Sequence, residues 1–270
     1  MSLGIVINGP EGIVLAAESR VTLGATIASP TGSQQIPFSF DNATKLLNFS
    51  QPNTTVGVVT YGLAVIGQKT PRTASSFVPE FEANLPKQRL PITDFASELS
   101  NFFMKQWQAN MPSNYQGPAM TFVIAGFDPN DVYGQVHQVD IPHSPKPVPL
   151  SMVGSFNITI GGQHEIITRI LEGSDVRLSD ALQKALNLQP SQVKILNQTL
   201  KSFQLAIPLE ALALQDCVDL VVSFIRTTME VQRFSIGIRG VGGAIDVAII
   251  TRNKDLQFVQ RKEIHGELKH

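Results

Sequence analysis

The first sixty residues of the chain constrain its fold most. An alternating apolar run over residues 4–7 is followed by a Gly/Pro turn over residues 8–12 and by a second apolar run over residues 13–17. Two short apolar runs on either side of such a turn predict a β-hairpin. The small side chain of Ser2 permits removal of Met1. Ser2 would then carry a hydroxyl nucleophile and a free amine on one residue.

The rest of the pattern alternates between strands and helices. A helix is expected to begin at Thr93 as its N-cap, with apolar side chains at helical spacing behind it. Two further helices are expected at about 163–172 and 209–231. The expected strands cover residues 56–60, 64–66, 120–126, 132–139, 244–251 and 256–260. This order predicts an α+β fold in which two sheets lie between two helical layers.

Three segments stand outside this pattern. Residues 29–42 are polar and turn-rich and predict a loop, and the Pro-rich residues 142–149 predict a surface connection. Residues 173–208 predict a helix from Leu178 to Leu186, then a short strand or extended piece from Val193 to Leu196. We expect a single domain over residues 1–270 with insertions at about 29–41 and 173–208.

Composition excludes several classes of function. The 270-residue chain has a net charge of −1, which does not favour nucleic acid or an anionic membrane as a partner. Its apolar runs are about half the roughly 18–20 residues that span a bilayer, and no secretory signal is expected at its start. The single cysteine, Cys217, excludes an internal disulfide and predicts a small buried apolar residue. We therefore expect a cytoplasmic protein with no metal or organic cofactor.

Five motifs occur in order along nearly the whole chain. Residues 12–22 resemble a DG-V-LAAD-R-T hairpin, and Lys45 follows after an insertion of about a dozen residues. Residues 125–128 resemble a GG-D strand end, residues 161–163 stand where a GSGS motif opens a helix, and residues 241–251 resemble an SGG-IDVAVIT strand. Together these motifs resemble the proteasome β-subunit family of N-terminal nucleophile hydrolases.

The resemblance implies a fold, an activity and a set of site residues. The fold is the four-layer αββα sandwich of that superfamily, and the activity is hydrolysis of peptide bonds. Ser2 stands at the position of the nucleophile, Glu18 at the acidic position and Lys45 at the catalytic lysine. A free α-amine has a pKa of roughly 7.7–8.0 and can act as the base, while a nearby ammonium paired with a carboxylate tunes it.

The resemblance also implies residues that bind substrate. Gly62 stands where the family donates an oxyanion N–H, and Thr22 stands where the backbone pairs with an extended peptide. Thr60 would form the wall of the pocket for the side chain before the scissile bond. Arg20 is placed with this group and is expected to pair with acids near the site. The expected partners are a peptide or protein substrate and further copies of the chain in a ring. Whether an ATPase or a second subunit type takes part stays open.

The chain also departs from the family. Two residues that support the nucleophile appear as Gly162 and Val241, and residues 231–240 contain no acid where the family has an aspartate. The sequence also allows simpler roles: Ser2 as a small residue that permits Met1 removal, Glu18 as a surface charge at a strand end and Lys45 as a solvated strand lysine. Two alternative functions therefore stay open, a catalytically inactive ring or scaffold subunit and an amidase or transpeptidase with one defined substrate.

Overall fold

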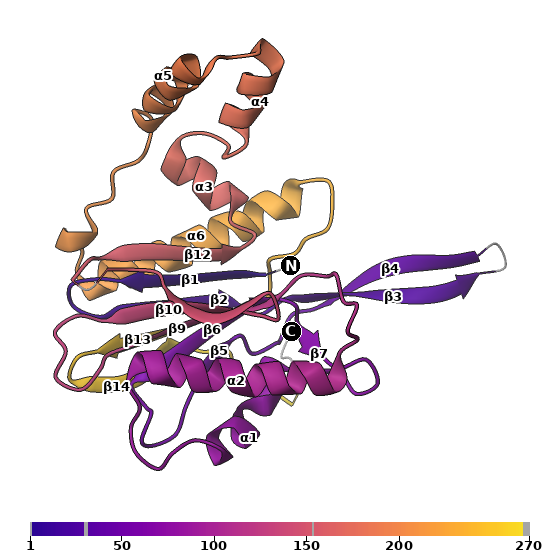
Figure 1. The fold of residues 1–270 in the computed structure, drawn as a ribbon, viewed down its shortest axis with the longest axis vertical. Helices are drawn as coiled ribbons and strands as arrows, with labels where there is room; N and C mark the ends of the chain where they lie inside the picture. The colour runs from indigo at the N-terminus through magenta and orange to yellow at the C-terminus, as the bar shows by residue number, and fades with distance from the viewer. Residues whose placement is uncertain (1, 30–31, 153, 267–270) are drawn as a thin grey trace. The chain divides into compact units, whose positions relative to one another are not determined.

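The computed structural model describes residues 2–29, 32–152 and 154–266, and the chain is a mixed helix-and-strand protein (Figure 1). Met1, whose removal the sequence predicts, lies outside the described residues. The chain separates into two compact units. One unit is Gln163–Pro208, and the other combines the chain before it with the chain after it. The larger unit holds every expected site residue.

One sheet of the larger unit has five antiparallel strands and contains the N-terminal hairpin. Its order is β12 (Asn157–Gly162), β1 (Leu3–Asn8), β2 (Ile13–Glu18), β13 (Ile245–Thr251) and β14 (Lys254–Gln260). Every residue of β1 and β2 is buried, as continuous apolar runs in the middle of a covered sheet require. The predicted N-terminal hairpin and the two C-terminal strands are confirmed, whereas β12 was not predicted.

The second sheet also has five antiparallel strands. Its order is β11 (Ser144–Pro149), β10 (Gln135–Ile141), β9 (Met120–Gly126), β6 (Val56–Gly62) and β5 (Leu46–Asn48). One short antiparallel pair, β7 (Val65–Ile66) with β8 (Arg72–Thr73), follows β6 along the chain. Lys45 directly precedes β5, so the end of this sheet carries the lysine toward the first sheet.

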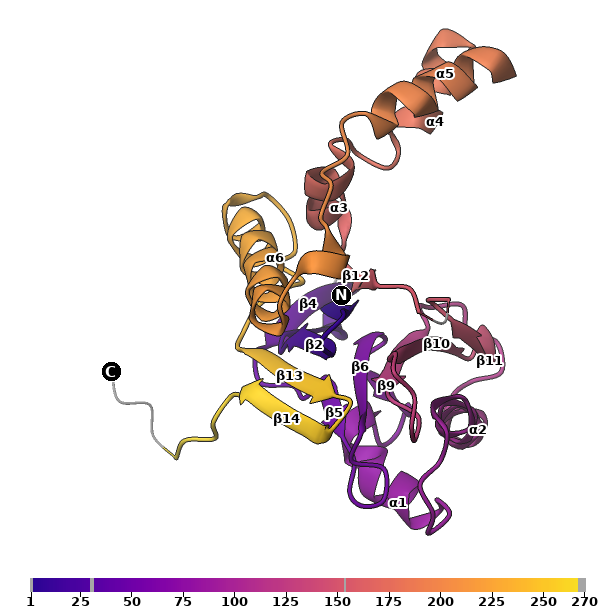
Figure 2. The same ribbon diagram turned by 90° about the vertical axis from the view of Figure 1, so that its left-hand side faces the viewer.

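The two sheets pack face to face, and each has one helix on its outer side (Figure 2). Side chains from both sheets form a shared apolar cluster that includes Val6, Leu15, Val59 and Val123. Helix α6 (Leu214–Phe234) contacts β1, β2 and β13, and helix α2 (Ile92–Asn110) contacts β9, β10 and β11. The helical turn η1 (Ala74–Phe77) and helix α1 (Val78–Ala83) extend the aromatic core beneath α2. Cys217 in α6 is buried, as predicted.

The smaller unit is helical. It contains α3 (Glu165–Glu172), α4 (Leu178–Leu186) and α5 (Pro190–Lys201), and the turn η2 (Leu209–Ala211) begins the return to the larger unit. The predicted helix 178–186 is confirmed. The predicted strand or extended piece over 193–196 is wrong, because these residues lie inside α5. Pro190 at its first position and the capping pair Gln189 and Gln192 start that helix.

Two predicted connections are strands instead. The predicted loop over 29–42 is wrong for residues 32–40, which form β4 (Gly32–Phe40) and pair antiparallel with β3 (Val21–Ser29). The predicted surface connection over 142–149 contains β11. Both β4 and β11 are at the edge of their sheets, the position at which a strand tolerates proline. The prolines, together with the polar and turn-forming residues of 29–42, therefore misled the prediction.

The start of α2 differs from the prediction by two residues. The helix begins at Ile92 with Pro91 as its N-cap, and Thr93 lies inside the first turn. The Ile92 N–H donates to Oδ1 of Asp128 at 2.6 Å. A carboxylate supplied from the end of β9 therefore caps the helix, and a cap from a distant residue leaves no local sequence pattern.

Candidate functional site

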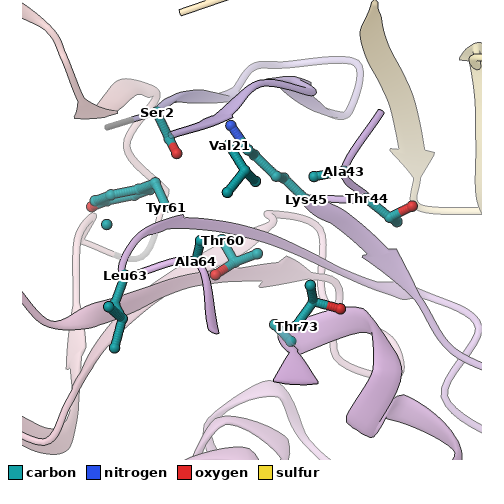
Figure 3. Close-up of a pocket in the computed structure, with 12 residues that line it drawn as sticks. Ser2, Val21, Ala43, Thr44, Lys45, Thr60, Tyr61, Leu63, Ala64 and Thr73 are labelled. Carbon is teal, nitrogen blue, oxygen red and sulfur yellow. The ribbon is translucent and has the colours of Figure 1, made fainter. Parts of the chain in front are cut away.

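Ser2 directly precedes β1 and lies at one side of a small pocket. Its residue is 4 % exposed, and the pocket has room of about 20 Å³, enough for roughly one water molecule. In Figure 3 the Ser2 hydroxyl and the end of the Lys45 side chain point toward the same space. The pocket is lined by Ser2, Val21, Ala43, Thr44, Lys45, Thr60, Tyr61, Gly62, Leu63, Ala64, Thr73 and Ala74.

Lys45 and Glu18 form a buried ion pair beside this pocket. Lys45 Nζ donates to Oε1 of Glu18 and also to the carbonyl oxygen of Arg20. The Lys45 side chain is 6 % exposed and the Glu18 side chain is 0 % exposed. Charged side chains this deeply buried are stable only when they are paired and hydrogen-bonded. Solvated roles for these two residues, the simpler reading of the sequence, do not fit their burial.

Backbone N–H groups from three separate segments also converge on the Glu18 carboxylate. The Leu3 N–H donates to Oε1 at 3.1 Å, the Arg20 N–H to Oε2 at 2.7 Å and the Gly242 N–H to Oε2 at 3.0 Å. Leu3 directly follows Ser2, so Glu18 connects the backbone next to Ser2 with the Lys45 ammonium. This carboxylate fixes the position of both groups.

The pKa of Lys45 is lower than its ordinary value, mainly because burial penalises the ammonium. The Glu18 carboxylate opposes this shift, and the positive charges of Lys262 and Arg20 add to it. Lys262 is held near the site because its Nζ pairs with the buried Asp246. A buried lysine whose pKa is lowered in this way, beside a pocket, marks a candidate functional site.

Arg20 does not line the pocket but clamps the segment behind it. Its Nε and Nη2 donate to the two carboxylate oxygens of Asp41 at 2.6 and 2.7 Å. This bidentate pair holds the pKa of Asp41 below its usual range. The Ala43 N–H donates to the Ser19 carbonyl oxygen at 2.9 Å. This hydrogen bond and the Arg20–Asp41 pair fasten residues 41–43, which lead to Lys45, to residues 19 and 20, which follow β2.

The remaining predicted site residues fall into two groups. Thr60 and Gly62 line the pocket. Gly62 has φ +85°, and a Cβ there would lie 2.2 Å from the Ala119 carbonyl oxygen, so the position requires glycine. Thr22 lies in β3, where its Oγ1 is 3.0 Å from Oγ of Ser39, and it is not among the residues that line the pocket. Their roles in binding substrate stay predictions.

Two of the three departures from the motifs of the resembled family, Gly162 and Val241, are buried or close-packed in the structure. Gly162 pairs with Leu3 across the sheet, and a Cβ at Gly162, whose φ is +85°, would lie 1.9 Å from the Ser2 carbonyl oxygen. The backbone of β12 therefore approaches Ser2 too closely for any side chain at position 162. Val241 is buried, and its N–H donates to Oε1 of Gln232 at 3.0 Å. The structure thus places no hydroxyl at either position.

Tyr61 is a part of the site that the sequence did not indicate. Its ring packs on the backbone of Gly161, where a Cβ would lie 2.0 Å from the ring. Its hydroxyl lies 3.4 Å from Oε1 of Gln138, whose amide donates to Asp140 at 3.0 Å. Burial, with a smaller effect of Asp140, raises the pKa of Tyr61 to about 12. The sequence offers one indication that Tyr61 belongs to the site: this large aromatic residue directly precedes Gly62.

Comparisons with known proteins do not identify the chain: no known family profile and no curated protein matches it. Within the described residues, no three His, Cys, Asp or Glu side chains are grouped as metal ligands. In that same part of the chain, the helices are too short or too polar to cross a membrane. The assignment of a function therefore depends on the geometry around Ser2.

Proposed function

We propose that this protein is an N-terminal nucleophile hydrolase of peptide bonds, with Ser2 as the nucleophile once Met1 is removed. The observation that carries the proposal is the buried Glu18 carboxylate, which binds both the Lys45 ammonium and the N–H next to Ser2. Two face-to-face sheets, each covered by one helix, support the four-layer αββα arrangement that the sequence resemblance implies. Four of the predicted site residues line one pocket: Ser2, Lys45, Thr60 and Gly62.

The reaction would begin at the Ser2 hydroxyl. The free Ser2 amine accepts the hydroxyl proton while Oγ attacks the scissile carbonyl carbon. The Gly62 N–H is the group expected to stabilise the resulting oxyanion. The amine then donates its proton to the leaving nitrogen, and an ester remains on Ser2. A water molecule, deprotonated by the same amine, hydrolyses this ester and restores the free hydroxyl.

Lys45 and Glu18 have supporting roles in this reaction. The positive charge of Lys45 near the Ser2 amine would lower the pKa of that amine, so more of it is neutral and able to accept a proton. Glu18 keeps Lys45 charged and fixes its position through the network described above. The protein would act in a ring of identical subunits on peptide or protein substrates, without a metal or organic cofactor, in the cytoplasm.

Hydrolysis of a fluorogenic peptide tests the proposal. Ser2→Ala removes the nucleophile and should abolish turnover, whereas Ser2→Thr keeps a hydroxyl at the same atom and should retain part of it. Both variants leave the buried network intact, so each should fold like the wild type by circular dichroism. Equal turnover by the wild type and Ser2→Ala would contradict the proposal.

Specific observations favour two alternatives. Positions 162 and 241, where the resembled family has serine hydroxyls that support the nucleophile, are Gly and Val, which favours a catalytically inactive ring or scaffold subunit. The small pocket of about 20 Å³ favours an amidase or transpeptidase with one defined substrate. The inactive subunit predicts assembly without turnover in the wild type. The restricted enzyme predicts reaction with one ligand and no degradation of unstructured proteins.

A further inference from the structure

The hairpin of β3 and β4, residues 21–40, projects from the larger unit as an arm (Figure 1). Each strand has nine residues, and at about 3.3 Å per residue the arm is about 30 Å long. Its strands form a separate two-stranded sheet, and among the described residues they pair only with each other. The arm is therefore a long ribbon that joins neither main sheet.

The arm has one apolar face. Val21 lies opposite Phe40 and Leu23 lies opposite Phe38, and directly opposed residues share a face of the sheet. Ile36, Phe38 and Phe40 are 40, 38 and 61 % exposed, although they alternate along β4 as a buried face would. The rings of Phe38 and Phe40 already pack edge to face, with centroids 5.5 Å apart. This face has the character of a core surface that lacks a cover.

The arm also lacks the charges that protect an exposed ribbon. Residues 21–40 contain no Asp, Glu, Lys, Arg or His, in a chain of which 16 % is charged. Soluble proteins protect exposed strand edges with charged side chains, above all lysine, or cover them. Charged residues are likewise depleted in the centre of protein interfaces. An uncharged ribbon with an apolar face therefore points to a protein partner that covers it.

A second apolar surface lies on the same unit, at the end of α6. Phe234, Ile236 and Ile238 are 80, 105 and 53 % exposed. We define these three residues as the α6 end. Each copy of the chain thus carries both an uncharged apolar arm and an apolar surface elsewhere. Because the arm has no charged side chain, an apolar partner surface can cover it without burying an unpaired charge of the arm.

We propose that the arm of one copy packs its apolar face on the α6 end of a second copy. The two surfaces differ, so the contact is heterologous and repeats from copy to copy, closing into a ring if the rotation permits. One face of the arm offers an area on the order of 500 Å², so one contact buries on the order of 1,000 Å² over the two partners, at the low end for a specific interface. The proposal names the surface of the assembly and is independent of the Ser2 chemistry.

The base of the arm belongs to the site. Val21 begins β3 and lines the pocket, and Asp41 directly follows β4 and binds Arg20. A neighbour that holds the arm would therefore restrain the segment that positions Lys45. Assembly through the arm predicts faster reaction of Ser2 in the assembled protein than in single copies.

Sedimentation velocity on matched variants tests the contact. Phe38→Ser/Phe40→Ser removes the arm face and Phe234→Ser/Ile236→Ser removes the α6 end. Each should weaken assembly at least about tenfold, because two large apolar side chains lose their burial. Val148→Ser is the matched control, since Val148 is 48 % exposed on another edge strand, and it should assemble like the wild type.

Mixing the two defective variants gives the sharpest result. Each alone should sediment as a single copy, whereas the mixture should form one-to-one pairs through the intact arm of one variant and the intact α6 end of the other. A wild type that stays a single copy at tens of micromolar overturns the proposal, and so does an arm variant that still assembles. If the arm binds only extended peptide and not a second copy, the wild type stays a single copy, and the proposal is overturned.

Two further results complete the test. An α6-end variant that assembles normally while the arm variant does not would overturn the heterologous contact in favour of arm-to-arm pairing. Should the double arm variant fail to fold by circular dichroism, Ile36→Lys places one charge on the same exposed face and must weaken assembly. All assembly measurements can be repeated with Ser2→Ala, so a failure of the catalytic proposal leaves this test intact.

Discussion

The ammonium of Lys45 and the carboxylate of Glu18 form an ion pair that is almost completely removed from solvent, with side-chain exposures of 6 and 0 %. Burial of two charges is costly, and a fold that needed only stability could use two apolar residues of similar size at these positions. The pair lies against the residue that follows Ser2. Its position supports the proposed role of the pair in chemistry at Ser2.

Glu18→Gln should destabilise the protein strongly. The amide keeps the shape of the side chain but leaves the Lys45 ammonium buried without its counter-charge, and breaking such pairs costs about 3–5 kcal/mol. Urea denaturation measures the loss. Lys45→Met together with Glu18→Gln removes both charges, so the double variant should lose less than the sum of the single variants. Additive losses would show that the two side chains do not interact.

The pH dependence of Glu18→Gln has a defined sign. Burial already lowers the pKa of Lys45, and removal of the carboxylate that opposes this shift lowers it further. Between that lowered pKa and the unfolded value of about 10.4, the unfolded chain binds more protons than the native protein, so native stability rises with pH. The stability deficit of the variant relative to the wild type should therefore shrink as the pH is raised toward 10.

Gly162→Ala should displace the strand that carries Ser2. The new Cβ would lie 1.9 Å from the Ser2 carbonyl oxygen, and φ +85° is unfavourable for alanine. Strain and overpacking together should cost about 2–4 kcal/mol in urea denaturation. Gly24→Ala is the control, because no atom lies within 4 Å of its added Cβ, and it should change stability by less than about 0.5 kcal/mol. Equal effects would contradict the close approach of β12 to Ser2.

Tyr61 should titrate later than an ordinary phenol. Its pKa of about 12 exceeds the reference value of 10.0, so the native protein keeps this proton between these pH values while the unfolded chain loses it. The stabilisation is complete below pH 10 and is lost as the pH rises through 12, and two pKa units correspond to about 2–3 kcal/mol. Absorbance of phenolate should show a late step that Tyr61→Phe removes. An unchanged titration in that variant would refute the assignment.

Arg20→Lys tests whether the positive charge of Arg20 or its bidentate geometry stabilises the contact with Asp41. Lysine keeps the positive charge but cannot bind both carboxylate oxygens of Asp41 at once. Because both side chains are partly exposed, the loss should be only about 1 kcal/mol. Asp41→Asn should cost a similar amount, and the double variant should cost little more than either. A variant with Arg20→Lys that matches the wild type in urea would assign no stabilising role to the bidentate contact.

The sequence predicted the parts of this fold that depend on local patterns. Continuous apolar runs on both sides of a Gly/Pro turn identified β1 and β2, and apolar spacing identified α2, α3, α4 and α6 but neither α1 nor α5. Proline content misled the predictions for β4 and β11, because a proline at a sheet edge costs no ladder hydrogen bond and only the tertiary structure shows which strands are at edges. The alternation of Ile36, Phe38 and Phe40 was the available signal for β4.

The candidate site was predictable to the extent that it lies on motif residues. Glu18, Lys45, Thr60 and Gly62 stand in recognisable segments, and the structure brings them together with Ser2 around one pocket or its supporting network. The partners that hold these residues were not predictable. Asp41 and the Gly242 N–H reach the site through chain reversals whose end points depend on packing. Tyr61 gains its environment from glycines on a different sheet.

The intact mass of the protein, before and after treatment with a peptide epoxyketone, tests the central claim most directly. The account predicts loss of Met1 followed by a single adduct that maps to Ser2, and no adduct in Ser2→Ala. Lys45→Met should label much more slowly, because the amine then lacks its neighbouring positive charge. A protein that retains Met1, or a free Ser2 that never forms an adduct, would contradict the assignment of Ser2 as a nucleophile.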